Sequence, residues 1–323
     1  MPAPACGMTA LSTRRKPVTY WGWPYPPPSM PPSKRPASAC SACKEKAMTT
    51  MTSIAELSAS FSRIRLELNG RVGYLILNRP EVHNAFDEVM ISEMTQAINA
   101  FAHESECAVM VLKSDGKHFS AGADLNWMRK QAAMDFDDNL KDARELANLM
   151  DTLDRFPKPS IALVNGAAYG GALGLVCCCD IAISSHKASF CLSEVKLGLI
   201  PAVISPYVVR AMGPRQSRRY MLTAERFDAS MALALGVVHE IADDLDAAAA
   251  PIIQNLLSGS PQALGWCKSL IARLQSGVID EHTRDYTSER IARIRVSAEG
   301  QEGLNAFFDK RSPAWVNDTG SKD

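Results

Sequence analysis

The sequence lacks several features that mark common classes of protein. No stretch comes near 18 consecutive apolar residues without a charge, so we do not expect a transmembrane helix. Neither G-x-G-x-x-G nor G-x-x-x-x-G-K followed by Ser or Thr occurs, so the usual signatures of dinucleotide and nucleoside-triphosphate binding are missing. The six histidines show no spacing typical of metal ligands. We therefore expect no membrane span, no nucleotide cofactor and no metal site.

The chain also lacks a net charge: over its 323 residues, 35 Lys and Arg residues balance 35 Asp and Glu residues. The balance is uneven along the sequence. Residues 1–50 hold seven basic residues against Glu45 alone, which leaves 28 basic and 34 acidic residues, a net charge of −6, for the remainder. A mildly acidic body argues against nucleic-acid binding, which needs a basic face to displace counterions.

Residues 1–50 have no helical or strand periodicity and hold ten of the nineteen prolines. Too few apolar residues recur there to offset the entropy of ordering, so we expect this extension to be disordered. It has no apolar core of a secretory signal. A translation start at Met48 or Met51 is our preferred interpretation, ahead of a transit peptide.

The nine cysteines form no recognisable disulfide or metal framework. Cys177, Cys178 and Cys179 are consecutive and cannot pair with one another on one helix. A buried helix in a reducing cytoplasm explains them best. Cys40 and Cys43 form a lone C-x-x-C, and with no second pair in range a zinc site is not expected.

The apolar pattern predicts an α/β architecture with a largely parallel sheet, within a chain that is 46% apolar. Order is expected to begin near Phe61, and an Asn-Gly turn at 69–70 indicates a β-hairpin. The pattern predicts strands over 63–68, 72–77, 108–112, 161–164 and 181–183 and helices over 89–101 and 146–156. After Asp243 only helices are expected, over 247–257, 261–274, 281–296 and 301–308. We divide the chain into an extension (1–50), a core (55–243) and a C-terminal helical region (244–323).

Two turns rich in small residues stand out. The first covers residues 118–125 (HFSAGADL), and the second covers 165–174 (NGAAYGGALG) and opens a helix. Small residues let a backbone approach a ligand closely, and a helix N-terminus offers unpaired N–H groups. Two such turns facing each other could donate two N–H groups to one oxygen, forming an oxyanion hole.

Four motifs follow one another in register: 77–86 (LNRPEVHNAF), the two turns, and Ser193-Glu194 with 197–201 (LGLIP). This set resembles the crotonase (enoyl-CoA hydratase/isomerase) family over about residues 60–316. The resemblance implies a spiral of ββα units with a C-terminal helical trimerisation region. It also implies a homotrimer or a dimer of trimers, an acyl-CoA substrate, and no cofactor beyond the coenzyme A that the substrate carries.

The same resemblance implies roles for individual residues. The N–H groups of Ala123 and Gly171 would bind the thioester oxygen, and Glu194 would move a proton at the substrate's α-carbon. Asn126 stands where the family often has lysine. Contacts with coenzyme A or the acyl chain are implied for Ala85, Ala121, Asp124, Leu125, Asn126, Tyr169, Gly170, Gly174 and Lys310.

One glutamate expected of a family hydratase is missing. Such hydratases typically carry two glutamates, and the position of the first is occupied here by Gly174. We interpret this glycine as a specificity position, where the loss of a carboxylate leaves more space in the pocket. An isomerase could work with Glu194 alone. A hydratase must also orient a water, with help from Tyr169, Asn126 or a carboxylate of the substrate. A non-catalytic acyl-CoA-binding homologue is the third alternative.

Four segments favour the hydratase alternative. Residues 122–128, 170–180, 192–206 and 294–303 look like those of bacterial methylglutaconyl-CoA and carboxygeranoyl-CoA hydratases, which serve leucine and acyclic-terpene breakdown. Their substrates carry a carboxylate beyond the double bond, for which Lys196, Arg129 and Lys130 are candidate partners. We therefore expect hydration of a carboxylated, β-branched 2-enoyl-CoA, methylglutaconyl-CoA first.

Overall fold

The structure is a computed structural model that describes residues 53–275 and 277–317. The predictions for residues 1–50, including the C-x-x-C at Cys40 and Cys43, lie outside the described residues. Within those two ranges, no helix combines the length and the apolarity needed to cross a bilayer.

The main sheet has six strands in the order β1-β2-β3-β4-β6-β9. Strands β1 and β2 form the predicted antiparallel hairpin, and Gly70 in its turn has a φ of +55°, which suits an Asn-Gly turn. All other pairings in this sheet are parallel. The predicted parallel α/β architecture is therefore confirmed, with strands β1 (Ile64–Asn69), β2 (Val72–Leu77), β3 (Val109–Ser114), β4 (Ser160–Val164), β6 (Ile181–Ser185) and β9 (Glu240–Ala242).

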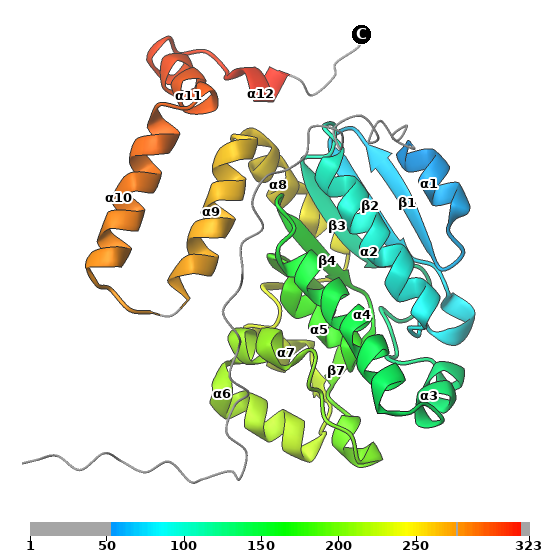
Figure 1. Ribbon diagram of the computed structural model, residues 1–323. Helices are drawn as coiled ribbons and strands as arrows, with labels where there is room; N and C mark the ends of the chain where they lie inside the picture. The colour runs from blue at the N-terminus through cyan, green and yellow to red at the C-terminus, as the bar shows by residue number, and fades with distance from the viewer. Residues whose placement is uncertain (1–52, 276, 318–323) are drawn as a thin grey trace, which may run out of the picture. The chain divides into compact units, whose positions relative to one another are not determined.

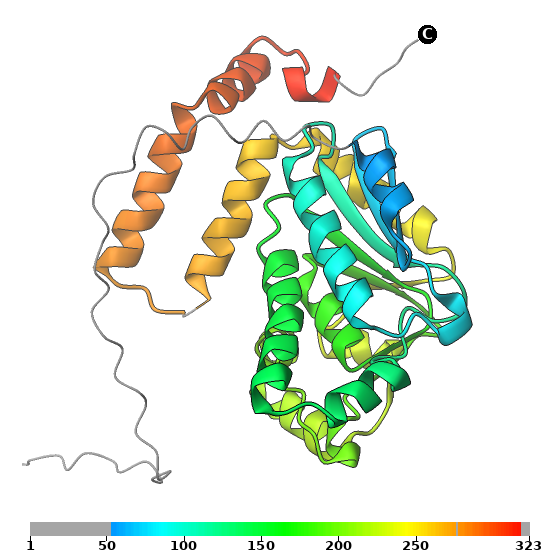
Figure 2. The ribbon, with the colours of Figure 1, turned by 45° about the vertical axis from the view of Figure 1, so that its right-hand side comes forward.

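Alternate residues of the parallel strands face two separate layers of the core. In β3, Met110 and Leu112 pack under helices α2 (Glu88–His103), α4 (Phe136–Asp154) and α5 (Gly171–Cys178). Val109 and Val111 face the other side, against α8 (Leu245–Ser258). Figure 2 shows α2 and α4 covering one face of the sheet. Because both faces are covered, the strands read as continuous apolar runs in the sequence.

A second, smaller sheet was not predicted. It contains β5 (Ala167–Tyr169), β7 (Ser189–Cys191) and β8 (Phe227–Asp228) in that order. The turn predicted over residues 165–174 therefore includes a short strand, which is parallel to β7. Helix α6 (Ser205–Thr223), broken at Gly213, and helix α7 (Ala229–Ala234) complete this part of the chain.

Two short helices were not predicted. Order begins before Phe61, because Ser53 and Glu56 form a capping box that starts α1 (Ile54–Ser60). Helix α3 (Leu125–Ala132) was also missed, although the side chain of Asp124 caps it by accepting hydrogen bonds from the N–H groups of Asn126 and Trp127. Both helices are too short to show a clear apolar period.

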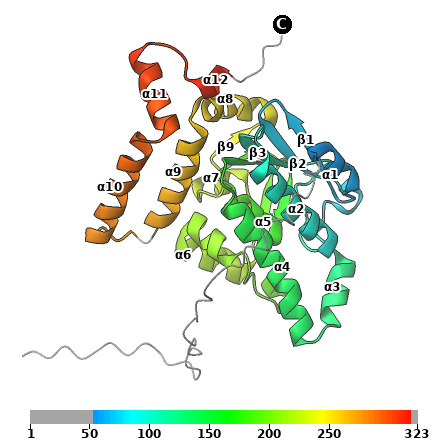
Figure 3. The ribbon, with the colours of Figure 1, turned by 45° about the horizontal axis from the view of Figure 1, so that its top comes forward.

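The C-terminal helices are confirmed as α9 (Pro261–Leu274), α10 (Glu281–Arg295) and α11 (Ala298–Phe308), followed by a short α12 (Ala314–Asn317). Helices α9 and α10 lie side by side (Figures 1 and 3), and neither contains a fully buried residue. Lys268 attaches α9 to the core through Asp180 (2.6 Å) and the carbonyl of Lys158 (2.8 Å). Apolar side chains exposed along this region include Ile271, Leu274, Ile291, Val296, Phe307 and Phe308.

Candidate active site

The loop after β2 is fastened to the loop after β3 by one buried side chain. Asn84 has a φ of +53°, which asparagine tolerates better than most residues, and its side-chain oxygen accepts a hydrogen bond from Arg79 N–H (2.7 Å). Its amide nitrogen donates to the carbonyls of Asp115 (2.8 Å) and His118 (2.9 Å). The first and second sequence motifs are thus held together at the carboxyl ends of neighbouring strands.

Two isolated β-bridges then bring the first three motifs side by side. Phe86 pairs with Ala123: its N–H donates to Gly122 O (2.8 Å), and its carbonyl accepts from Asp124 N–H (2.7 Å). Ser120 pairs with Ala168 in the same parallel manner. The two small-residue turns predicted from the sequence therefore lie next to each other.

These pairings leave two N–H groups free for a ligand. The Phe86 bridge uses groups of the two residues that flank Ala123, so Ala123 N–H points away from it. Gly171 is the first residue of α5, whose opening N–H groups have no partner within the helix. Among the described residues, neither N–H donates a hydrogen bond. The Phe86 ring lies 3.5 Å from the point where a Cβ of Gly171 would stand, so one residue contacts both segments.

Glu194 places a carboxyl group beside the second of these turns. It opens the short 3-10 helix η3 (Glu194–Leu197), and its Oε1 lies 3.2 Å from the point where a Cβ of Gly170 would stand. Gly170 has a φ of +54°, which with this close approach explains the glycine. Glu194 Oε2 is buried, and no described residue donates to it. Burial raises the pKa of Glu194, as suits a group that must both take and give a proton.

Gly174 lies in the interior of α5 rather than on an open surface. A Cβ at this position would stand 2.3 Å from Ile204 Cγ2 and 3.3 Å from Met150 Sδ. Ile204 is buried and begins the approach to α6. The volume that a second glutamate side chain would need is therefore occupied by apolar atoms of the chain itself.

Both side chains considered as water-orienting helpers have partners elsewhere. Tyr169 Oη lies 3.0 Å from Ser189 Oγ, and the side-chain oxygen of Asn126 accepts from Arg129 Nη1 (2.9 Å). The remaining residues predicted to contact coenzyme A or the acyl chain include buried and exposed positions of the same loops: Ala85 is buried, whereas Ala121 and Leu125 are exposed.

The cations proposed from the sequence differ in availability. Lys130 is paired with Glu88 (2.6 Å), whereas Lys196 is exposed two residues after Glu194 and forms no ion pair with any described residue. The sequence interpretation missed Arg226, whose guanidinium lies 5.4 Å from the centre of the Tyr169 ring. Only the strand pairing of β7 with β8 brings Arg226 there, so no local pattern could have indicated it.

Lys310 is not brought to this site within one chain. It follows α11 with a φ of +54°, and α11 lies at the opposite end of Figures 1 and 2 from α3, which begins directly after Asp124. The loops that carry Ala123, Gly171 and Glu194 thus come together without it.

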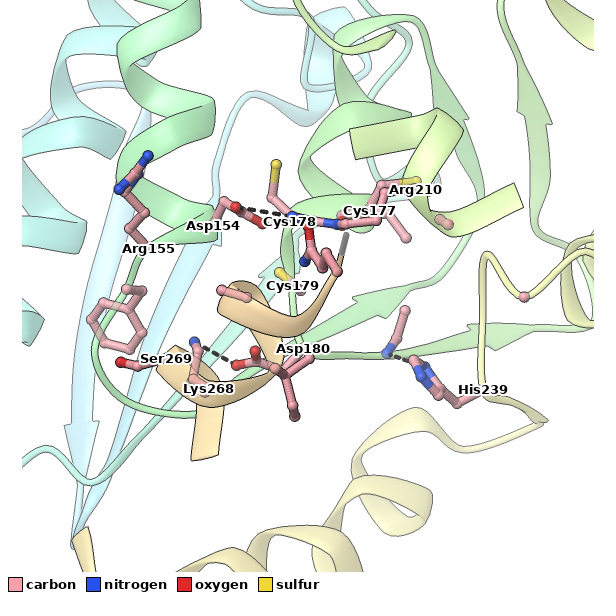
Figure 4. Close-up of a pocket in the computed structure, with 18 of the residues that line it drawn as sticks. Asp154, Arg155, Cys177, Cys178, Cys179, Asp180, Arg210, His239, Lys268 and Ser269 are labelled. Carbon is pink, nitrogen blue, oxygen red and sulfur yellow. Dashed lines mark hydrogen bonds and ion pairs between the residues drawn. The ribbon is translucent and has the colours of Figure 1, made fainter. Parts of the chain in front are cut away.

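A cavity of about 870 Å³ lies elsewhere, between α9 and the C-terminal end of α5 (Figure 4). Four of its charged side chains are engaged with one another, in the ion pairs Asp154–Arg210 and Asp180–Lys268. Burial raises the pKa of the Cys177 thiol to about 12, so it is not a reactive thiolate. This cavity contains none of the predicted catalytic residues.

Comparison with known proteins agrees with this geometry. The family model for enoyl-CoA hydratase/isomerase matches residues 67–318. An enoyl-CoA hydratase from Shewanella pealeana has a similar crystal structure, with 65% identity, a TM-score of 0.81, and coverage of 82% of this chain and 100% of that one. The enoyl-CoA hydratase AKT6-1 of Alternaria alternata is 33% identical over 72% of this chain and 77% of its own length. The 2,3-dehydroadipyl-CoA hydratase of Escherichia coli is 30% identical over 75% and 94%.

The family match spans most of the chain, and the solved relative superposes along its whole length on 82% of this chain. The predicted crotonase fold is thereby confirmed. The chain is an enoyl-CoA hydratase-type enzyme and belongs to the enoyl-CoA hydratase/isomerase family.

Proposed function

We propose that this enzyme hydrates a 2-enoyl-CoA whose acyl chain is β-branched and ends in a carboxylate, with methylglutaconyl-CoA as the first candidate. The observation that carries the proposal is the position of Glu194. Its buried carboxyl group lies against Gly170, next to the free N–H of Gly171. A proton-transfer group and an oxyanion donor are thus adjacent.

In the proposed reaction, the thioester oxygen accepts hydrogen bonds from Ala123 N–H and Gly171 N–H. Glu194 takes a proton from water while the water oxygen bonds to C3 and the C2=C3 electron pair moves toward the thioester carbonyl. The two N–H groups stabilise the resulting enolate, since fixed dipoles in a site without bulk water act strongly on developing charge. Glu194 then returns the proton to C2, which yields the 3-hydroxyacyl-CoA.

A single carboxyl group carries both proton transfers in this scheme. Tyr169 and Asn126 are engaged with Ser189 and Arg129, and a glutamate at position 174 would collide with Ile204. The unpartnered Oε2 of Glu194 is free to bind the water. A carboxylate of the substrate would supply the second acceptor.

Two cations support the carboxylated substrate. Lys196 and Arg226 form no ion pair with described residues, and the Tyr169 ring that Arg226 overlies directly precedes Gly170. A carboxylate at the end of the acyl chain would satisfy one of them. The relative named for 2,3-dehydroadipyl-CoA, an acyl chain that also ends in a carboxylate, is consistent with such a substrate. Roles in leucine or acyclic-terpene breakdown in the cytoplasm form part of this proposal.

We further propose a homotrimer or a dimer of trimers. Helices α9 and α10 have no fully buried residue in the single chain, yet they expose Ile271, Leu274 and Ile291. A second copy covering these side chains would remove apolar surface from water. It would also bring the Lys310 of a second copy toward the coenzyme A phosphates. Light scattering at micromolar concentration tests the assembly, and a monomeric mass would contradict it.

One panel of thioesters separates the three candidate functions. Purified protein is incubated with crotonyl-CoA, methylglutaconyl-CoA and a 3-enoyl-CoA, and products are identified by mass spectrometry. Loss of enoyl-thioester absorbance with a gain of one water supports the hydratase. Migration of the double bond in the 3-enoyl-CoA without a hydroxylated product supports an isomerase that uses Glu194 alone. Tight binding without turnover of any ester supports a non-catalytic acyl-CoA-binding homologue.

A further inference from the structure

Arg79, in the first sequence motif, is a buried arginine with no role in the chemistry proposed above. Its side chain is 11% exposed. The guanidinium donates from Nη1 to the carbonyl of Ala85 (2.8 Å) and lies close to two carboxylates, with Nη1 3.0 Å from Asp87 Oδ2 and Nη2 3.2 Å from Asp124 Oδ2. Taking a guanidinium out of water is costly, so a buried one must be held by several partners.

The partners of Arg79 surround a single structural element, the bridge between Phe86 and Ala123. Ala85 and Asp87 are the residues on either side of Phe86, and Asp124 follows Ala123. The bridge itself consists of only two hydrogen bonds, of 2.8 and 2.7 Å. Arg79 therefore clamps the two strands of the bridge to each other from one side.

Both carboxylates that contact Arg79 also cap the N-termini of helices. Asp87 Oδ1 accepts from Met90 N–H (2.8 Å) at the start of α2, and Asp124 Oδ1 accepts from Asn126 N–H (2.8 Å) at the start of α3. Their second oxygens are the ones that face Arg79. Through these two side chains, Arg79 fixes the orientation of the Ala123 segment relative to the N-termini of α2 and α3.

From this geometry we propose that Arg79 is a positioning residue, which fixes the direction of the Ala123 N–H and thereby half of the oxyanion hole. The inference rests on the proposed role of Ala123 in binding the thioester oxygen. Arg79 acts through the bridge and does not touch the substrate. A polar network of this kind has a structural role as well, so the test must separate hole geometry from stability.

The test compares Arg79→Met with Arg63→Met. Arg63 shares the Asp87 carboxylate (Nε–Oδ2 3.0 Å) but forms no hydrogen bond or ion pair with Ala85 or Asp124, so it is the matched control. We expect Arg79→Met to lower kcat by about 10–100-fold, as a displaced catalytic group does, while the Kd for the acyl-CoA stays within about threefold. Arg63→Met should leave kcat near the wild-type value. Arg79→Lys keeps the charge and one of the contacts, so its kcat should lie between those of Arg79→Met and Arg63→Met.

A spectroscopic readout decides whether the hole has moved. A bound enoyl-CoA labelled at its thioester carbonyl should show a lowered carbonyl stretching frequency in the wild type, because two N–H groups polarise it. The lowering should be smaller in Arg79→Met and unchanged in Arg63→Met. If Arg79→Met does not fold, Arg79→Lys and Asp124→Asn carry the same test.

The possible failures are distinguishable. Wild-type kcat and an unchanged carbonyl frequency in folded Arg79 variants would overturn the positioning role while leaving the proposed function intact. A wild-type complex with no lowering of the carbonyl frequency would overturn the oxyanion role of Ala123, and the inference about Arg79 with it.

Discussion

Ile204 lies directly against the backbone of Gly174, so close that a Cβ on Gly174 would stand 2.3 Å from Ile204 Cγ2. Contacts below about 3 Å are never made by real Cβ atoms, so a side chain at 174 requires Ile204 to move. The family position expected to hold one of two glutamates is thus closed by packing. The absence of a glutamate at position 174 is therefore matched by the packing of Ile204 in the core.

This packing predicts that Gly174→Ala destabilises the protein. Alanine is favoured over glycine inside a helix by about 1 kcal/mol, but overpacking a core costs about 1–3 kcal/mol. Chemical denaturation should show a net loss of unfolding free energy for Gly174→Ala and a smaller one for the same change made in an Ile204→Ala background, which lacks the clashing methyl group. Gly174→Glu alone should be worse than Gly174→Ala. A Gly174→Ala protein more stable than wild type would show that the proposed clash is absent.

The burial of Glu194 predicts an effect on stability as well as on activity. Its pKa is raised in the folded state, so its neutral form is favoured there, and the stability this provides at low pH is lost as pH rises through the folded-state value. Glu194→Gln should therefore unfold at a higher temperature than wild type at about pH 8. The difference should vanish toward about pH 4, near the unfolded-state pKa of glutamate. Equal melting temperatures at both pH values would contradict the burial of the charge.

The same raised pKa should appear in catalysis. If Glu194 must be ionised to accept the proton of water, kcat/KM falls as pH drops through its pKa in the free enzyme. We expect the midpoint of this acidic limb to lie above the ordinary value of 4.5. A limb at or below that value would mean that another group controls the rate.

Gly171 offers a direct test of the oxyanion hole, because it is the first residue of α5. Proline is well tolerated at the first position of a helix and has no N–H, so Gly171→Pro deletes the donor with little harm to the helix. Gly171→Ala is the control, since its Cβ would lie at an ordinary 3.5 Å from the Phe86 ring and the N–H remains. Loss of one oxyanion donor should lower kcat by about 10²–10³-fold in the proline variant relative to the alanine variant. Similar kcat values for the two would remove Gly171 N–H from the mechanism.

The proposed carboxylate subsite predicts a dependence on substrate. Arg226→Gln and Lys196→Gln should each be measured with methylglutaconyl-CoA and with crotonyl-CoA, which has no terminal carboxylate. Loss of the charge that binds the carboxylate should raise KM for the first ester by about tenfold, the equivalent of one charge-assisted hydrogen bond, and leave the second unchanged. Parallel changes for both esters, or none for either, would exclude that residue as the carboxylate partner.

Much of the core could be predicted from local pattern. Strand β2 and helix α9 match their predicted ranges, because β2 is a mostly apolar run that follows the Asn-Gly turn and α9 has an apolar period that begins at Pro261. Strand β5 was predicted as a turn because its three residues, Ala-Ala-Tyr, form a strand only where β7 pairs with them. Helix α3 was missed since its capping residue, Asp124, also belongs to a motif that was interpreted through ligand binding.

The candidate site likewise contains residues that local motifs predict and residues that they do not. Glu194 and the two turns could be located from motifs, because close backbone approach requires small residues and the carboxylate stands within a recognisable motif. Arg79 and Ile204 could not, since their importance comes from partners 45 and 30 residues away along the chain. Arg226 likewise reaches Tyr169 only across the second sheet.

The most direct test of the proposed mechanism is the steady-state hydration of methylglutaconyl-CoA by the wild type and by Glu194→Gln, followed by the loss of enoyl-thioester absorbance. Glutamine preserves the size of the side chain but cannot transfer the proton. We predict that the wild type forms the 3-hydroxyacyl product and that Glu194→Gln lowers kcat by about 10²–10⁴-fold while still binding the ester. Full activity in Glu194→Gln would contradict the assignment of both proton transfers to this carboxyl group.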